Sequence, residues 1–250
     1  MQQMIEKTVR EIAIENPASV RVFEKLGIDY CCGGRKPLAD ACADAGVPME
    51  QALDLLANAS HPEDAAEPEW KATRLSTLTS HIVARYHDLA RREIPRIEAL
   101  AHRVKSRHGD AHPEVGEIEE LFLSLAQELS THMMKEEQML FPYIERIEAA
   151  EHEGKAAPTM PFGSVARPIA VMTADHDDAG ALLARMRELS SGYAIPDGAC
   201  PTFRALYNAL EEFERDTHHH VHLENNILFP RAIAMEAEAA GRARAAAYGI

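Results

Sequence analysis

Apolar positions recur along most of this chain at the three- and four-residue intervals of amphipathic helices. Four long stretches of this kind are predicted, at about residues 73–105, 114–150, 165–190 and 201–238, and glycine and proline mark each break between them. Long helices joined by short connections are typical of an antiparallel four-helix bundle. Pro95 falls inside the first stretch, where we expect a kink.

Shorter helices with sharper breaks are predicted before the bundle. Asn16 and Pro17 end the first of them, Gly27 caps the second, and a loop of sequence DYCCGG follows at residues 29–34. Gly46 stops the next short helix. These pieces predict a compact helical unit separate from the bundle.

The predicted fold class is therefore all-α, with a small N-terminal helical domain and an antiparallel four-helix bundle. We place the small domain at residues 1–58 and the bundle at residues 71–240. Residues 59–70 carry prolines and acidic residues without an apolar period, so we predict a linker there, and residues 241–250 are assigned to a C-terminal tail.

Composition and charge narrow the range of functions. Apolar residues make up 46% of the 250 residues and aromatic residues 6%, a balance that favours a helical protein with a sizeable core. The formal net charge of -14 repels phosphate groups, so we expect neither nucleic acid nor a membrane as a partner. The chain starts without the apolar stretch of a signal peptide, and its four cysteines do not resemble a secreted disulfide framework. We therefore expect a cytoplasmic protein.

An internal repeat is the strongest indication of chemistry. The pattern His-x-x-x-Glu-x-x-x-Leu-Phe-Pro begins at His132 and again at His220, 88 residues later. In the helix before each copy lies a histidine followed by aspartate, at His87 and at His176, 89 residues apart. The bundle is therefore predicted to consist of two copies of a helix pair.

The spacing within the repeat points to a metal site. Residues i and i+4 lie one turn apart on the same face of a helix, so each repeat histidine and its glutamate can bind one centre together. Apolar neighbours place these side chains on the core side, where uncompensated charges are costly. Two divalent ions would compensate them and keep positions open for small ligands, which favours a dinuclear redox metal over a closed structural zinc site, although iron, manganese and zinc all accept such ligands. The predicted ligands are His87, His132, Glu136, His176, His220 and Glu224.

These motifs together resemble a known family. The DYCCGG loop ahead of a bundle with ARYHD, HMMKEEQMLFP, DHD and HVHLENNILFP is similar to the iron–sulfur cluster repair di-iron proteins, the RIC, YtfE or ScdA family, and the bundle alone resembles hemerythrin-like proteins. The resemblance extends from about residue 8 to about residue 234. It implies two non-haem iron ions with an oxo or hydroxo bridge, bound by the six ligands above, and it places the loop cysteines of the family at Cys31 and Cys32.

The same resemblance implies a function. Family members restore iron–sulfur clusters after nitrosative or oxidative damage, so we expect iron supply, NO removal or both, with damaged iron–sulfur proteins as clients and a homodimer as the assembly. NO reductase activity at the di-iron centre stays open. The alternative is a hemerythrin-like carrier or sensor of O2 or NO. The linked cysteine domain argues against this alternative, as does the presence of four rather than five ligand histidines. A di-iron oxidase would be expected to use Glu-x-x-His spacing, which this chain lacks.

Cys31 and Cys32 are the candidates for chemistry outside the bundle. Adjacent cysteines rarely form a disulfide with each other, and the glycines that follow let the loop approach another surface closely. We expect iron binding or delivery, thiol redox chemistry or NO capture there, and two small loop residues without a function are the alternative. Cys42 and Cys200 are expected to be structural.

Two acidic residues and three histidines complete the set. Glu128 and Asp216 each lie four residues before a repeat histidine, where they are predicted to accept a hydrogen bond from a ligand imidazole or to line an access channel, with solvated acids as the alternative. At 100° per residue, His218 and His222 point away from the core and His219 lies to the side, so all three are assigned to the surface.

Overall fold

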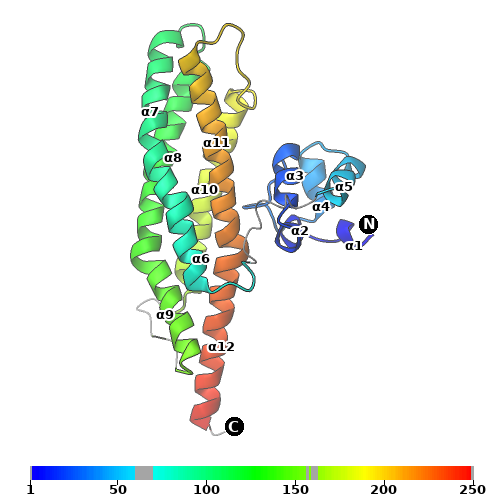
Figure 1. The fold of residues 1–250 in the computed structure, drawn as a ribbon, viewed down its shortest axis with the longest axis vertical. Coiled ribbons are helices and arrows are strands. Elements are labelled where there is room, and N and C mark those ends of the chain that lie inside the picture. Colours follow the sequence, from blue (N-terminus) through cyan, green and yellow to red (C-terminus); the bar gives the residue numbers. More distant parts are fainter. Residues whose placement is uncertain (1, 60–69, 156–157, 159–162, 249–250) are drawn as a thin grey trace.

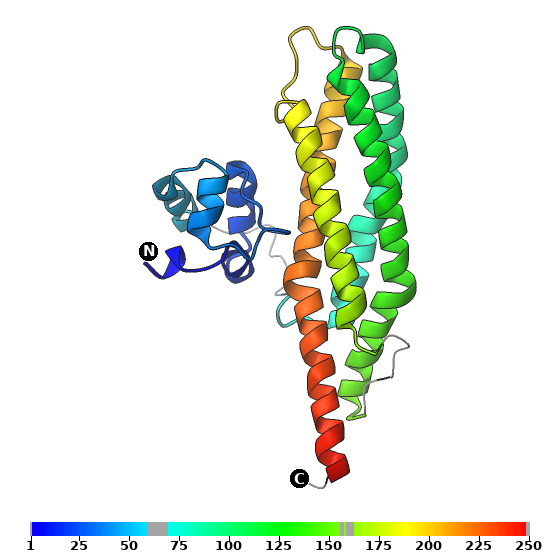
Figure 2. The same cartoon turned by 180° about the vertical axis from the view of Figure 1, so that it is seen from behind.

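The computed structural model describes residues 2–59, 70–155, 158 and 163–248, and within these ranges the chain is helical without any strand. Figures 1 and 2 show a long helical bundle with a small group of short helices beside the middle of α11 (Pro201–Leu223). The predicted all-α class is confirmed. No helix in the described ranges has the length and apolar character required to cross a bilayer.

The N-terminal helices begin and end where local signals place them. Thr8 and Glu11 form a capping box at the start of the second helix, and Gly27, with φ of 66°, ends the third in the left-handed conformation that glycine adopts without strain. Gly46 takes the same conformation after the fourth helix. The five helices are α1 (Gln2–Ile5), α2 (Val9–Glu15), α3 (Ser19–Leu26), α4 (Leu38–Asp44) and α5 (Met49–Ala57).

Four helical rods form the bundle, as predicted. The first rod is α6 (Leu75–Ile82), η1 (Val83–His87) and α7 (Asp88–His108), and the second is α8 (Glu114–Lys135), η2 (Glu136–Leu140) and α9 (Phe141–His152). The third is α10 (Ala166–Leu189), and the fourth is α11, η3 (Glu224–Leu228) and α12 (Phe229–Tyr248).

The rods differ from the predicted stretches mainly at the end of the chain. Helix α12 continues to Tyr248, into the segment assigned to a tail, because the alanine-rich sequence there contains no proline and favours a helix. Pro95 lies inside α7 without ending it. Most of the predicted linker, residues 60–69, lies outside the described residues.

Ligand-bearing turns are wider than an ordinary α-helix. The short segments η1, η2 and η3 are π-helical, so that the N–H of Phe141 reaches the carbonyl of Glu136, five residues back, and the N–H of Phe229 reaches that of Glu224. Each of the last two segments precedes a proline, Pro142 or Pro230, whose ring would clash with an ordinary preceding turn. The Leu-Phe-Pro of the repeat therefore explains why the turn opens at the predicted glutamates.

The bundle contains a polar layer between two apolar clusters. One cluster is centred on Phe122, Phe203 and Tyr207, and the other on Leu78, Tyr143 and Phe229. The predicted ligands lie along each rod between the residues of these two clusters. The apolar clusters above and below exclude water from the layer.

The duplication also extends to the helix starts. Glu148 of α9 accepts hydrogen bonds from the N–H groups of Leu75 (2.6 Å) and Ser76 (3.0 Å), which open α6. Glu236 of α12, 88 residues after Glu148, accepts from the N–H of Val165 (3.0 and 3.1 Å) ahead of α10. In both halves a carboxylate of the second rod therefore satisfies the unpaired N–H groups at the start of the first.

Candidate metal centre

The six ligands predicted from the sequence meet in the polar layer. They come from all four rods, and each of the six residues is at most 3% exposed. They form two groups of four donors, within each of which the donor atoms lie less than 4.8 Å apart. One group takes its histidines from His87 and His220, the other from His132 and His176, and both glutamates belong to both groups.

Each carboxylate presents one oxygen to each histidine pair. Glu136 places Oε2 3.4 Å from Nε2 of His87 and Oε1 3.3 Å from Nε2 of His132. Glu224 does the same in the other half, with Oε1 3.0 Å and Oε2 3.1 Å from the Nε2 atoms of one histidine of each pair. The arrangement is that of two carboxylates placed to bridge two cations.

The imidazole rings turn their Nε2 atoms toward the centre. Nδ1 of His87 lies 2.6 Å from the carboxylate of Glu137, and Nδ1 of His132 lies 3.2 Å from that of Asp175. Because a carboxylate only accepts hydrogen bonds, Nδ1 carries the proton of the neutral ring and Nε2 carries the lone pair. Yet within the two histidine pairs the Nε2 atoms lie only 3.1 and 3.0 Å apart.

A cation in each group would account for these contacts. Both carboxylate oxygens of Glu136 and Oε2 of Glu224 are buried without a hydrogen-bond donor of suitable geometry, which is costly unless positive charge lies nearby. Donor atoms bound at about 2.1 Å in adjacent positions of an octahedron lie about 3.0 Å apart, close to the separations observed here. The side chains therefore fit a pair of metal ions that share two carboxylates.

The electrostatics of the layer show that protons and metal ions compete for it. Burial disfavours a charged His132, but the neighbouring Glu136 outweighs burial and raises the pKa of His132 to about 9. Burial lowers the pKa of His220. Burial opposes ionisation of Glu224 as well, yet His220 and His176 hold its pKa well below the ordinary value. Metal binding to this layer is therefore expected to release protons.

Three residues hold the ligand imidazoles at Nδ1. Besides Glu137 and Asp175, Asn225 places Oδ1 3.0 Å from Nδ1 of His176. Glu137 and Asn225 are 88 residues apart and each directly follows a glutamate shared by the two groups, so the internal repeat carries a signal for both. Asp175 is also bonded by Lys135, at 3.0 Å. These contacts fix the ring orientation and tautomer of the histidines.

Glu128 and Asp216 do not hold the imidazoles. Glu128 is exposed. Asp216 accepts a hydrogen bond from Arg85 (3.0 Å), and it lines a small cavity beside His220, the second of the two roles considered for it. A spacing of four residues puts Glu128 one turn away from His132 on the same helix face, whereas Nδ1 of His132 points across to Asp175 on a neighbouring rod.

The cysteine loop lies against the third rod. Asp29 accepts hydrogen bonds from the N–H groups of Cys31 (2.9 Å) and Cys32 (3.0 Å) and so shapes the loop. Cys31 is buried and Cys32 is half-buried, with Sγ of Cys32 3.5 Å from the carbonyl oxygen of His176. The hydrogen bond with Cys32 and burial raise the pKa of Cys31 well above its usual value. The loop therefore contacts the backbone of a predicted ligand, and Figure 2 shows it extending from the small domain to the bundle.

The histidines assigned to the surface are covered by the N-terminal domain. His222 is buried, with 7% exposure, and His218 and His219 are half-buried, so the surface assignment was wrong for His222. All three rings lie around Tyr30, at centroid distances of 6.4, 6.1 and 5.5 Å for His218, His219 and His222. They do point away from the ligands, but helical phase cannot show that a second domain packs on that face.

Two further contacts hold the domains together. The side-chain nitrogen of Asn226 donates to the carbonyl of Tyr30 (3.0 Å), and Arg10 donates to the carbonyl of Asn226 (3.2 Å). In an ordinary helix the carbonyl of Asn226 would accept a hydrogen bond from the N–H of residue 230, but Pro230 has no N–H. Arg10 therefore satisfies an acceptor that the repeat proline leaves without its helical partner.

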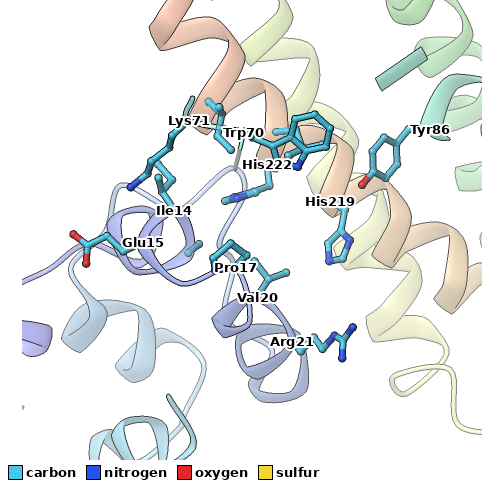
Figure 3. A pocket seen from close by; sticks show the side chains of 13 residues that line it. Ile14, Glu15, Pro17, Val20, Arg21, Trp70, Lys71, Tyr86, His219 and His222 are labelled. Carbon is cyan, nitrogen blue, oxygen red and sulfur yellow. The ribbon is translucent and has the colours of Figure 1, made fainter. Parts of the chain in front are cut away.

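A cavity of about 440 Å³ separates the domains near the metal layer. Figure 3 shows Pro17 and Val20 of the small domain facing Trp70, Tyr86 and His222 of the bundle across it. The ring of Tyr86 also lines the small cavity beside His220 and stacks on the imidazole of that ligand, at 5.6 Å and 7°. Tyr86 thus lies between the domain interface and the metal layer.

Comparison with known proteins agrees with this geometry. Residues 78–232 match the model of the hemerythrin HHE cation binding domain, and residues 5–60 match a domain of unknown function, DUF542. A relative from Citrobacter koseri named iron-sulfur cluster repair protein YtfE is 37% identical over 226 residues, covering 90% of this chain and 96% of the relative. The protein of the same name from Pectobacterium atrosepticum is 36% identical over 234 residues, covering 92% and 98%. Because the similarity spans both domains and nearly the full length of these relatives, this chain belongs to the YtfE (RIC) family of iron–sulfur cluster repair proteins.

Proposed function

We propose that this protein repairs iron–sulfur clusters damaged by nitrosative and oxidative stress, with two non-haem iron ions, joined by an oxo or hydroxo bridge, in the buried layer. The observation that carries the proposal is that Glu136 and Glu224 each present one oxygen to each of two histidine pairs. The relatives over both domains are named for cluster repair.

Six protein ligands would leave positions open on two bound metals, and iron there would supply ligand exchange and redox chemistry. The protein contributes a fixed set of lone pairs, because Glu137, Asp175 and Asn225 hold the imidazoles with Nε2 facing inward. The apolar clusters on both sides keep bulk water away. Small ligands such as NO or O2 would reach the layer past Tyr86.

The cysteine loop supports a role in supplying iron. Cys32 contacts the carbonyl of His176, and its sulfur lies 3.8 Å from that of Cys31. Two thiols beside a ligand residue suit the capture of iron as it leaves the bundle. Damaged iron–sulfur proteins are the clients in this proposal, and the unpaired state of the cysteines suits the reducing cytoplasm.

A homodimer is also proposed. Met139 and Val171 are large apolar side chains, 46% and 52% exposed, on neighbouring rods. The contact of Lys135 with Asp175 one turn away places them close together. An exposed apolar patch suits contact with a second copy, and sedimentation of wild-type protein against Val171→Glu would test it: the variant should be monomeric if the patch is the interface.

The function is tested by reactivation of a damaged iron–sulfur enzyme with iron-loaded protein. The double variant Cys31→Ser/Cys32→Ser should keep its iron and optical spectrum but lose most of the reactivation rate. Cys200→Ser, at the far end of the bundle, should keep its iron, its spectrum and the wild-type reactivation rate. Wild-type protein that binds NO or O2 reversibly and never reactivates the enzyme would overturn the proposal in favour of a carrier or sensor. Loss of iron from the double variant would place the cysteines in the metal site itself.

A further inference from the structure

A second cavity, of about 620 Å³, lies between the cysteine loop and the outer faces of α10 and α11. The loop from Asp29 to Cys32 and the C-terminal part of α3 form one side, and residues of the two long helices form the other. This volume is in the range of pockets that hold small molecules. None of the six metal ligands lines it.

Small residues keep the space next to the thiol open. Gly180, Ala181 and Ala184 of α10 line the cavity, and a Cβ at Gly180 would lie 3.6 Å from Sγ of Cys32. Larger side chains along this face of α10 would fill the space beside the sulfur. Because Cys31 is buried and Cys32 is half-buried, Cys32 is the thiol that an occupant can reach more easily.

Charges of both signs surround the opening. Among the described residues, Arg21 and Arg215 form no salt bridge, and neither do Asp177 and Glu211, and all four line the cavity. Their side chains are therefore available to an occupant. Guanidinium groups recognise carboxylates in a planar, two-point contact, and carboxylates recognise ammonium groups.

These features select one ligand chemistry. A purely anionic ligand would meet Asp177 and Glu211, and a purely cationic one would meet Arg21 and Arg215. A zwitterion satisfies both sets, and the half-buried thiol of Cys32 offers a soft, polarisable contact that a sulfur of the ligand matches. We propose that the cavity binds a small zwitterionic thiol, an amino acid or short peptide of the size of cysteine or glutathione, with its sulfur beside Cys32.

The use of this site rests on the proposed function, although the binding does not. A third thiol next to Cys31 and Cys32 would complete a sulfur-rich exit for iron leaving the bundle. The binding involves no covalent step. Because no cavity residue is a metal ligand, metal-free and metal-loaded protein should bind the thiol alike.

Isothermal titration calorimetry of the full-length, metal-loaded protein, without oxygen, tests the inference. Reduced glutathione and cysteine are the probes, and comparison of the two gives the size of the ligand. 2-Mercaptoethanol, which lacks the charges, and γ-glutamyl-2-aminobutyryl-glycine, which lacks the thiol, should each bind at least about tenfold more weakly than the better probe.

Two substitutions separate a built site from a passive groove. Ala184→Trp places an indole in the cavity and should weaken binding at least about tenfold, whereas Ala240→Trp, at an exposed position of α12, should leave it unchanged. Arg215→Ala should weaken binding to a similar degree. Absence of saturable binding of both probes, or equal binding by Ala184→Trp and wild type, would overturn the inference. Thiol binding without cluster repair would instead overturn the proposed function alone.

Discussion

Asp175→Asn should loosen one metal of the pair and leave the other in place. Asp175 accepts from Nδ1 of His132 at 3.2 Å, and no comparable contact joins it to the histidines of the other group. The asparagine keeps the shape and one acceptor oxygen but removes the charge that increases the basicity of the imidazole. Loss of such a partner typically weakens metal binding about 10- to 100-fold, or about 1.4 to 2.7 kcal/mol.

The effect on folding should be much smaller. Asp175 is 31% exposed in its side chain, and so its ion pair with Lys135 is screened by water and contributes at most about 1 kcal/mol. The melting temperature of the metal-free protein should therefore change little. An unchanged melting temperature would show that Asp175→Asn loses metal without losing structure.

A chelator titration followed by metal analysis measures the release of each ion. Wild-type protein and Asp178→Asn, an exposed carboxylate on the same helix, should lose both metals only at high chelator concentration. Asp175→Asn should lose one equivalent at about 10- to 100-fold lower concentration and retain the second. Equal release by the two variants would refute the reasoning, as would simultaneous loss of both metals from Asp175→Asn.

Three further predictions concern the ligands, the helix caps and the domain contact. His132→Ala should hold less than one metal pair per chain by metal analysis, whereas His102→Ala, at a histidine whose side chain is 76% exposed, should hold the wild-type amount. Glu148→Gln should lower the free energy of unfolding of metal-free protein by about 1 to 2 kcal/mol. Burial opposes ionisation of Glu148, but hydrogen bonds from Ser76 outweigh it and lower its pKa below 4.5. The stabilisation is therefore present above pH 4.5 and lost as the pH falls through the folded pKa, and denaturant titrations at several pH values should show the two proteins converge. Arg10→Ala should speed proteolytic cleavage between the domains without changing the metal content, because it removes a hydrogen bond across the interface; unchanged cleavage would show that this contact does not hold the domains together.

The fold was predictable where the signals are local. Apolar periodicity together with proline and glycine breaks placed the four rods, because these patterns act within one helix and its ends. The end of α12 was missed, since an alanine-rich helix can continue past the core without any packing requirement. The π-helical turns were not predicted either, although the proline of the repeat is the local cause of two of them.

The duplicated motif determined the six ligands because chemistry and geometry are both encoded in its spacing. A histidine and a glutamate four residues apart must share a helix face, and two copies of that pair with their upstream histidines leave little freedom in how the donors meet. The repeat also carried signals for Glu137 and Asn225 that became evident only from the contacts of these side chains.

Only the tertiary structure determines which residues cover each helix face. Asp175 lies on a different rod from the imidazole that it holds, and the burial of His222 depends on Tyr30, which is 192 residues earlier in the chain. The cavity beside Cys32 likewise exists only because a loop of the small domain meets a glycine and two alanines of α10. Such contacts depend on how separate elements pack, and helical period constrains only the direction in which a side chain leaves its own helix.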